Sequence, residues 1–300
     1  MKVGICVGAM ISNIEYIELA EELGYDSVWV ADSQMIWSDC YATLALAATR
    51  TSRIRLGTGV SIAGTRIAPV TASAIATINE LAPGRVFLGL GTGHTAMRTM
   101  GQDQMRLGPF KEYVRVVRDL LEGKSTPFTY EGLTREVAFM HKEMGYYRLE
   151  PRIPIHISAL GPLTQRWAGG VADGVVMVGT NPETIAAGME NVREGARRVG
   201  RALSSDLEVT TLLTGMVLRP GETTETERAL DEAGVWVSQM LHAAWHRASE
   251  PKRALGNAPS YLADVWEDYC AYVEAMDTPA ERRYQQVHVG HCSFLPDGER

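Results

Sequence analysis

The sequence has 300 residues, 45% of them hydrophobic, with a formal net charge of -7 and a pI near 5.6. One barrel-sized domain is compatible with this length. The acidic balance argues against nucleic acid as the main partner, because phosphate binding favours a basic surface. The sequence shows no secretion signal and no uninterrupted apolar run of membrane-spanning length, which predicts a cytoplasmic protein without a membrane partner.

Short apolar runs typical of strands alternate with helical patterns over most of the chain. The predicted strands are Lys2–Val7, Ser27–Val30, Arg53–Arg66, Arg85–Leu90, Ile155–Ala159, Gly174–Val178, Leu207–Val217 and Val287–Gly290. The first predicted helix follows a capping box at Ser12-x-x-Glu15. Three more helices are predicted at Cys40–Arg50, Val70–Leu81 and Pro109–Glu122. Two further helices begin near Pro162 and after the N-cap pair Asn181-Pro182.

This alternation predicts a (β/α)8 TIM barrel, with a doubly wound open sheet as the alternative. The whole chain, 1–300, is expected to form one domain with two additions. One is an excursion at about 123–150 with hairpin signals at Thr129–Gly132 and Arg135–Phe139, and the other is a helical insertion at about 221–279. Only ten residues follow the last predicted strand, too few for a normal eighth helix.

The third predicted strand is interrupted by glycines at 57, 59 and 64, where a plain strand would prefer side chains that pack. A bulge at Gly59, Val60 and Ser61, near the C-terminal end of this strand, would let a flat ligand approach the main chain. The alternative is a barrel strand that glycine merely softens.

In a barrel the active site lies at the C-terminal ends of the strands, so the residues after each strand are the candidates. They are rich in glycine and hydroxyl groups and poor in carboxylates, which disfavours a metal-dependent hydrolase. His242 and His246 have metal-ligand spacing on a predicted helix, but Ala243 stands where a general-base Glu would follow. A surface or core pair is therefore favoured, and no metal site is predicted.

The segment from Ser158 to Pro162 lies between a strand and a helix and predicts a phosphate cradle, with an ordinary β/α turn as the alternative. Gly91 and Gly93 match a dinucleotide fingerprint only loosely, and they lie on the fourth strand rather than the first. An open-sheet dehydrogenase is therefore disfavoured. Asp32 is either a solvated turn residue or a ligand contact, and Trp37 packs under its loop or stacks against a flat ring.

Together these patterns resemble the bacterial luciferase-like family of flavin- and deazaflavin-dependent barrel enzymes. The resemblance is carried by Gly24–Asp32, Thr51–Val60, Phe87–Gly93, Ile153–Pro162 and Ala168–Val175, and covers about residues 1–220. It thins out afterwards, with a late echo at Val287–His291. Within the family the chain is most similar to the branch that uses coenzyme F420, which includes methylene-tetrahydromethanopterin reductase-like proteins and sugar-phosphate dehydrogenases.

The resemblance implies a deazaflavin that lies across the strand ends, with its ring backed by a bulge on strand three and a cis peptide at Gly59–Val60. The implied cofactor contacts are Asp32, Gly59, Val60, Ser61, Gly91, Gly93, Ser158, Ala159, Leu160 and Gly161. In the sugar-phosphate dehydrogenases a His follows the strand-two Asp and a Glu follows G-T-G. Here these positions hold Ser33 and His94, while Trp37 is retained, so oxidation of a sugar hydroxyl is not expected.

His94 then becomes the candidate proton donor or acceptor beside Trp37, because imidazole titrates near neutrality. The alternative is that His94 only holds its loop. We expect an F420-dependent oxidoreductase that transfers hydride to a small organic substrate, and a homodimer as in other family members. An FMN-dependent two-component monooxygenase of the same family and a flavin-binding protein without catalysis are the alternatives.

Overall fold

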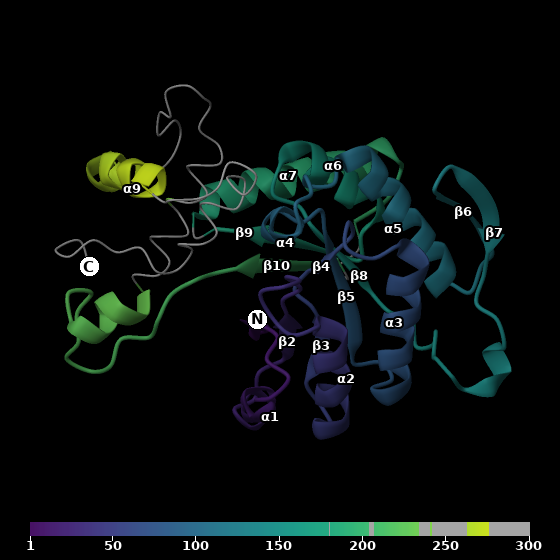
Figure 1. Ribbon diagram of the computed structural model, residues 1–300, viewed down its shortest axis with the longest axis horizontal. Helices are drawn as coiled ribbons and strands as arrows, with labels where there is room; N and C mark the ends of the chain where they lie inside the picture. Colours follow the sequence, from purple (N-terminus) through teal and green to yellow (C-terminus); the bar gives the residue numbers. More distant parts are fainter. Residues whose placement is uncertain (180, 204–206, 234–240, 242–262, 276–300) are drawn as a thin grey trace. The chain divides into compact units, whose positions relative to one another are not determined.

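The computed structural model describes residues 1–179, 181–203, 207–233, 241 and 263–275 (Figure 1). The chain divides into two compact units, Met1–Leu212 and Leu213–Arg300, and each is considered by itself. Among the described residues, no helix combines the length and the apolar character that crossing a bilayer requires.

The first unit is built on a parallel sheet in the order β1-β2-β3-β5-β8-β9-β10, with β4 paired to β5. The strands are β1 (Gly4–Val7), β2 (Ser27–Val30), β3 (Arg55–Thr58), β4 (Ser61–Ile62), β5 (Val86–Gly91), β8 (Ile155–Ser158), β9 (Gly174–Val178) and β10 (Glu208–Leu212). Helices lie around these strands, as a barrel requires (Figure 1). Within the described residues β1 and β10 each pair on one side only, and the strand predicted at Val287–Gly290 lies outside those residues.

The helices of the first unit mostly follow the predicted ranges. They are α1 (Glu15–Glu22), α2 (Cys40–Arg50), α3 (Ala68–Leu81), α4 (Thr95–Thr99), α5 (Leu107–Leu121), α6 (Pro162–Val171) and α7 (Pro182–Arg198). The cap predicted at Asn181 is confirmed, because its side chain accepts the N–H of Glu183. The capping box at Ser12 is wrong: α1 begins at Glu15 itself, with Ile14 as an N-cap that makes no side-chain bond.

The excursion predicted after α5 is a separate antiparallel hairpin. It consists of β6 (Thr126–Tyr130) and β7 (Leu133–Val137), followed by the short 3-10 helix η1 (Lys142–Met144). The connecting residues Glu131 and Gly132 both have positive φ, as a two-residue hairpin turn requires. The hairpin signal in the sequence is thus confirmed.

Strand three is interrupted where the glycines predicted a bulge. β3 ends at Thr58, the Gly59–Val60 peptide is cis, and β4 resumes at Ser61. The N–H of Gly59 donates to the carbonyl of Val30 at 2.7 Å, which ties the bulge to the end of β2. The predicted strand was too long at its end, because Thr65 and Arg66 belong to the loop before α3. Similarly, β10 ends at Leu212 rather than Val217.

Large rings fill the interior of the sheet near the N-terminal ends of its strands. Trp29 and Phe87 lie with ring centroids 4.3 Å apart, and His156 is 5.3 Å from each. Glycines make room for them: a Cβ at Gly57 would lie 2.2 Å from the Phe87 ring, and one at Gly174 would lie 2.2 Å from His156 Nδ1. Glycine in these strands therefore serves packing inside the sheet.

The described part of the second unit contains a helical stretch at 227–233 and helix α9 (Ala263–Ala275). Trp266 and Tyr269 of α9 are buried, with ring centroids 6.2 Å apart. Both stretches are helical and lie within 221–279; that this range is an insertion into one domain stays a prediction, and most of the remainder of the range lies outside the described residues.

Candidate active site

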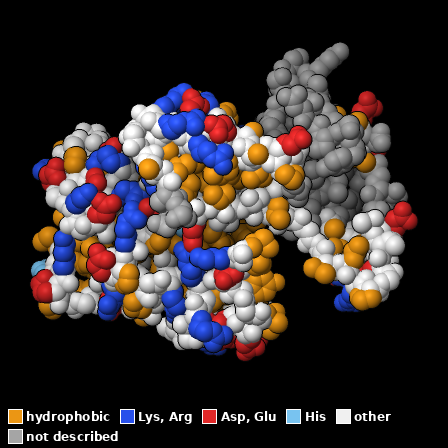
Figure 2. Space-filling view, turned by 180° about the vertical axis from the view of Figure 1, so that it is seen from behind, with side chains coloured by type: hydrophobic (Ala, Val, Ile, Leu, Met, Phe, Trp, Pro, Cys, Tyr) orange, Lys and Arg blue, Asp and Glu red, His pale blue; other side chains and the backbone are white. Residues whose placement is uncertain are grey.

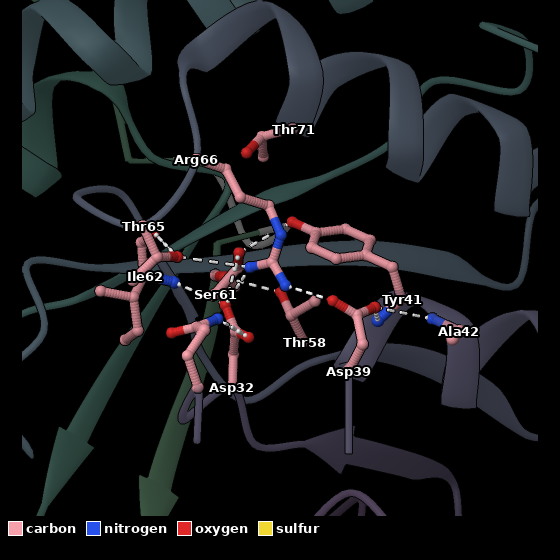
Figure 3. Close-up of polar contacts among 12 residues, drawn as sticks. Asp32, Asp39, Tyr41, Ala42, Thr58, Ser61, Ile62, Thr65, Arg66 and Thr71 are labelled. Carbon is pink, nitrogen blue, oxygen red and sulfur yellow. Dashed lines mark hydrogen bonds and ion pairs between the residues drawn. The ribbon is translucent and has the colours of Figure 1, made fainter. Parts of the chain in front are cut away.

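Asp32 lies two residues after the end of β2 and is 3% exposed. Its Oδ2 accepts the N–H of Ile62 at 3.1 Å and the hydroxyl of Ser61 at 3.3 Å, and it pairs with Nη1 of Arg66 at 2.7 Å. Its Oδ1 accepts from Nε2 of Gln34 at 2.5 Å. The carboxylate thus holds both residues of β4, directly after the bulge (Figure 3). Asp32 is therefore not a solvated turn residue, and its predicted contact with the cofactor stays a prediction.

Arg66 connects two carboxylates from different segments. Its Nη1 binds Asp32, its Nη2 pairs with Oδ2 of Asp39 at 2.6 Å, and its guanidinium carbon lies 4.8 Å from the centre of the Tyr41 ring. Figure 3 shows the guanidinium between the two acids. The Arg66 side chain is only 15% exposed. Burial lowers the pKa of Arg66, but the hydrogen bond and charge of Asp32 and the hydrogen bond of Asp39 raise it by more, so the group stays cationic.

Asp39 also caps α2, because its Oδ1 accepts the N–H groups of Tyr41 and Ala42, both at 2.9 Å. Burial raises the pKa of Asp39, but the N–H of Ala42 and the hydrogen bond and charge of Arg66 lower it by more, giving a net decrease. One carboxyl group therefore fixes both the start of α2 and the position of Arg66.

A second contact holds the bulge from behind. The hydroxyl of Tyr41 lies 2.8 Å from Oγ of Ser61. Burial raises the pKa of Tyr41 well above its usual value, so the phenol keeps its proton. Since Ser61 donates to Asp32, Tyr41 is the donor to Ser61. Sequence, burial and hydrogen bonds thus place a buried polar chain from α2 to β4.

The glycines at the end of β5 face side chains from the bulge. A Cβ at Gly91 would lie 2.7 Å from Cγ2 of Val60, and one at Gly93, where φ is +71°, would lie 2.2 Å from Cγ2 of Ile62. A Cβ at Gly59 would lie 2.6 Å from that of Trp29. These glycines therefore let the bulge pack against β2 and β5. That Gly59, Gly91 and Gly93 also contact a cofactor stays a prediction.

The predicted phosphate cradle is the turn from β8 into α6. Ser158 ends β8, Ala159 is buried, and Leu160 is largely exposed. α6 begins after Gly161, and its first turn has no side-chain cap. The carbonyl of Ala159 accepts Nε2 of Gln165 at 3.2 Å. The geometry is that of a helix N-terminus that opens next to the strand ends.

The two predicted catalytic residues lie in loops after β2 and β5. Trp37 is 46% exposed, and its ring covers Gly8 at the end of β1, where a Cβ would meet the ring at 3.1 Å. It therefore packs on one loop and keeps an open face. His94 is partly buried and forms the N-cap of α4, with its carbonyl accepting the N–H of Arg98.

Sequence reasoning missed Arg66, Asp39 and Tyr41 as parts of this site. The one available signal was a charged residue, Arg66, between two apolar runs directly after the bulge. Sequence reasoning also missed Gln34, whose Oε1 is buried and has no partner among the described residues.

A groove of about 380 Å³ lies beside the site rather than at the bulge. It is lined mainly by the loop before α3, by α5 and by the hairpin. Arg66, which binds Asp32 and Asp39, also lines this groove. Elsewhere in the described ranges, no group of three His, Cys, Asp or Glu side chains is placed to hold a metal ion. His242 and His246 lie outside those ranges.

A sequence model of the luciferase-like monooxygenase family matches residues 8–287. The chain belongs to this family. Its match to a 5,10-methylenetetrahydromethanopterin reductase of Methanolobus tindarius is 35% identical and covers 62% of the chain and 56% of the relative. A match to an F420-dependent glucose-6-phosphate dehydrogenase of Kribbella flavida is 29% identical and covers 83% of the chain and 84% of the relative. The chain thus spans little more than half the length of the reductases it matches.

Solved structures support the fold. A coenzyme F420-dependent tetrahydromethanopterin reductase from Methanopyrus kandleri superposes with a TM-score of 0.68 at 23% identity, over 83% of this chain and 73% of that one. A Baeyer-Villiger monooxygenase from Pseudomonas putida in complex with FMN gives 0.63 at 16% identity, over 96% and 83%. The predicted luciferase-like TIM barrel is therefore confirmed over the doubly wound alternative.

Proposed function

We propose that the protein is an F420-dependent oxidoreductase that transfers hydride to a small organic substrate. The observation that carries this proposal is the bulge at Gly59–Ser61, which lies at the strand ends and is held by the buried carboxylate of Asp32. Active sites of TIM barrels lie at this end of the strands. Similarity to relatives named as F420-dependent supports the cofactor assignment.

The residues at the strand ends fit a flat, polar-edged cofactor with an anionic tail. In this proposal the backbone of the partly exposed Val60 and the buried Ser61 backs the ring, and Gln34 Oε1 is a buried acceptor without a partner among the described residues. The uncapped first turn of α6, after Leu160 and Gly161, offers N–H groups for a phosphate. We therefore assign the ring to the bulge and the phosphate to the Ser158–Gly161 turn.

When bound, F420 supplies the hydride, and the chain supplies orientation and protons. In this assignment Trp37 offers its exposed ring face to one side of the substrate. His94 exchanges the proton that accompanies hydride transfer, at an imidazole nitrogen, in the reducing direction as a donor. The FMN-dependent monooxygenase reading is the second candidate, because the family includes such enzymes and the same bulge would back an isoalloxazine ring.

An apolar substrate fits the exposed side chains after β1 and β2. Met10, Ile11, Met35 and Ile36 are all exposed there, next to Trp37. The backbone of Ser38 donates to the carbonyl of Ala9 at 3.0 Å, which joins the two loops. We propose that these loops bind hydrophobic surface of the substrate. We further propose a single family domain, consistent with the match over 8–287, and a cytoplasmic homodimer.

The test is consumption of reduced F420 in the absence of oxygen with a panel of reducible organic acceptors. We expect the cofactor to be oxidised only when an acceptor is present. The mass spectrum of the product should show the acceptor with two hydrogens added. Product that forms only with reduced FMN and oxygen would support the monooxygenase instead. Binding of either cofactor without turnover on any acceptor would favour a binding protein.

A further inference from the structure

We propose that Arg66 is a positioning residue, which holds the cofactor-binding bulge in place by acting through Asp32. The inference rests on the proposed function, since it takes the bulge as the support of the cofactor ring. Arg66 is not assigned to contact cofactor or substrate. Its role is to fix a carboxylate that in turn fixes the backbone on which the ring lies.

The contacts of Arg66 join three segments that are distant in sequence. Its own backbone lies in the loop before α3, Asp32 lies after β2, and Asp39 lies at the start of α2. Nη1 lies 2.7 Å from Asp32 and Nη2 lies 2.6 Å from Asp39, so the two ends of the planar guanidinium each bind one carboxylate. A point charge such as a lysine ammonium cannot serve both acids in this geometry.

Burial makes the pair with Asp32 different from the surface ion pairs of the molecule. Asp32 is 3% exposed, and the Arg66 side chain is 15% exposed. A buried carboxylate that loses its cation is strongly destabilised, because the charge then remains buried without a compensating partner charge. Among the described residues, Arg66 is the cation that forms an ion pair with Asp32.

The carboxylate transmits this restraint directly to the bulge. Asp32 Oδ2 accepts the Arg66 hydrogen bond and also the backbone N–H of Ile62 and the hydroxyl of Ser61. Ser61 is adjacent in sequence to the Gly59–Val60 peptide. If Arg66 is removed, the oxygen that holds β4 is no longer fixed, and the bulge loses the preorganised shape that ligand binding requires.

The experiment compares wild type with Arg66→Met, Arg66→Lys and Arg118→Met. Arg118 is a matched control, because it pairs with the largely buried Asp173 at 3.2 Å near the N-terminal ends of the strands and contacts no residue of the proposed site. Fluorescence titration with F420 gives the dissociation constant of each. We expect an increase of roughly tenfold or more for Arg66→Met, an intermediate value for Arg66→Lys, and less than about threefold for Arg118→Met.

Hydrogen exchange on the cofactor-free proteins gives a readout that does not depend on F420. The amide of Ile62 is expected to exchange faster in both Arg66 variants and at the wild-type rate in Arg118→Met. Should Arg66→Met fail to fold, Arg66→Lys and the control still decide the matter. Two outcomes would overturn the inference. One is that Arg66→Lys leaves both the exchange of Ile62 and the F420 affinity unchanged. The other is that Arg118→Met loses as much F420 affinity as the Arg66 variants. Failure of wild type to bind F420 would instead overturn the proposed function.

Discussion

Two polar clusters lie at opposite ends of the strands, one around the buried Asp32 and one around the buried His156, and they differ in how the buried group is paired. The strand-end cluster consists of Asp32, Asp39, Tyr41, Ser61 and Arg66, and each of its charges has an opposite charge within 2.7 Å. The floor cluster, near the N-terminal ends, consists of Lys2, Arg55, His156 and Glu208. In it, Glu208 pairs with Arg55 at 2.6 Å and Lys2 at 3.2 Å.

His156 is the member of the floor cluster that is buried without hydrogen bonds among the described residues. It is fully buried, and neither ring nitrogen has a hydrogen-bond partner among the described residues. Its Nε2 lies 3.3 Å from a carboxylate oxygen of Glu208, but without hydrogen-bond geometry. Burial lowers the pKa of His156, the charge of Glu208 raises it, Arg55 lowers it and Asp173 raises it, and the net pKa is about 4. His156 is therefore neutral at pH 7.

The two clusters differ in what their charges hold in place. The strand-end cluster has a permanent cation and a fully bonded carboxylate, and it holds a backbone feature at the end where barrel enzymes bind ligands. The floor cluster lies at the opposite ends of the strands, and burial there favours the neutral form of its histidine. Changes at the strand ends should therefore affect ligand binding, and changes at the floor should affect stability alone.

The largest expected effect is on the strand-end cluster. Arg66→Met leaves the Asp32 carboxylate buried without its cation, and we expect the free energy of unfolding to fall by about 3–5 kcal/mol. Urea denaturation at pH 7.5 measures it. A loss below about 1 kcal/mol would mean that the pair behaves as a surface ion pair, and that the two clusters do not differ in the way described.

The floor cluster should make stability depend on pH. Because the folded-state pKa of His156 is lowered, its contribution is fully present above the unfolded value of about 6.5 and is lost as pH falls towards 4. The histidine alone then accounts for roughly 3 kcal/mol between pH 7.5 and 4. His156→Leu should remove this part of the slope and leave F420 affinity unchanged. Unfolding curves of both proteins across that range provide the check, and parallel slopes would contradict it.

The second histidine tested is at the strand ends. His94→Ala should lower turnover with saturating F420 by about 10²-fold, because the proposed proton donor is lost. Single-turnover kinetics, together with a binding titration, separate this effect from loss of the cofactor. Unchanged turnover with intact binding would leave His94 as a residue that only holds its loop.

Glycine substitutions at the two ends of the strands separate effects on ligand binding from effects on stability. Gly91→Ala places a Cβ 2.7 Å from Val60, and Gly174→Ala places one 2.2 Å from His156. Each is expected to lower the free energy of unfolding by about 1–3 kcal/mol through overpacking. Only Gly91→Ala should also weaken F420 binding. If Gly174→Ala weakens binding by the same factor, the division between the two ends is wrong.

The smallest effect is expected for Asp39→Asn. The asparagine oxygen still caps α2, and the pair that is lost is half exposed on the acid side, so the change should be about 0.5–1 kcal/mol. Thermal denaturation measures it. A loss as large as that of Arg66→Met would show that Asp39, and not Asp32, is the essential partner of the arginine.

The order of strands and helices was readable from the sequence because each short apolar run ends in a glycine or polar turn. The bulge was also predictable, since three glycines in one strand conflict with ordinary strand packing. The start of α1 was predicted wrongly, because the Ser12 and Glu15 spacing does not show where the helix begins. Local patterns therefore gave the elements well and their ends less well.

The contacts that define the two clusters were not readable. Arg66 and Asp32 are 34 residues apart, and no local pattern shows which carboxylate an arginine will meet. Asp32 was chosen for its place after a strand, but its use inside the protein depends on β4, the loop before α3 and the Gln34 side chain together. His156 lies in the strand predicted at Ile155–Ala159, but nothing in that pattern indicates Glu208 as its neighbour.

Titration of the purified protein with F420, and separately with FMN, tests the central claim most directly. The fluorescence of each ligand reports binding. The account predicts that F420 binds with a micromolar or lower dissociation constant and that FMN binds at least about tenfold more weakly. Binding of FMN alone would assign the bulge to a flavin and the protein to the monooxygenase branch. Binding of neither would contradict the claim that the residues at the strand ends form a cofactor site.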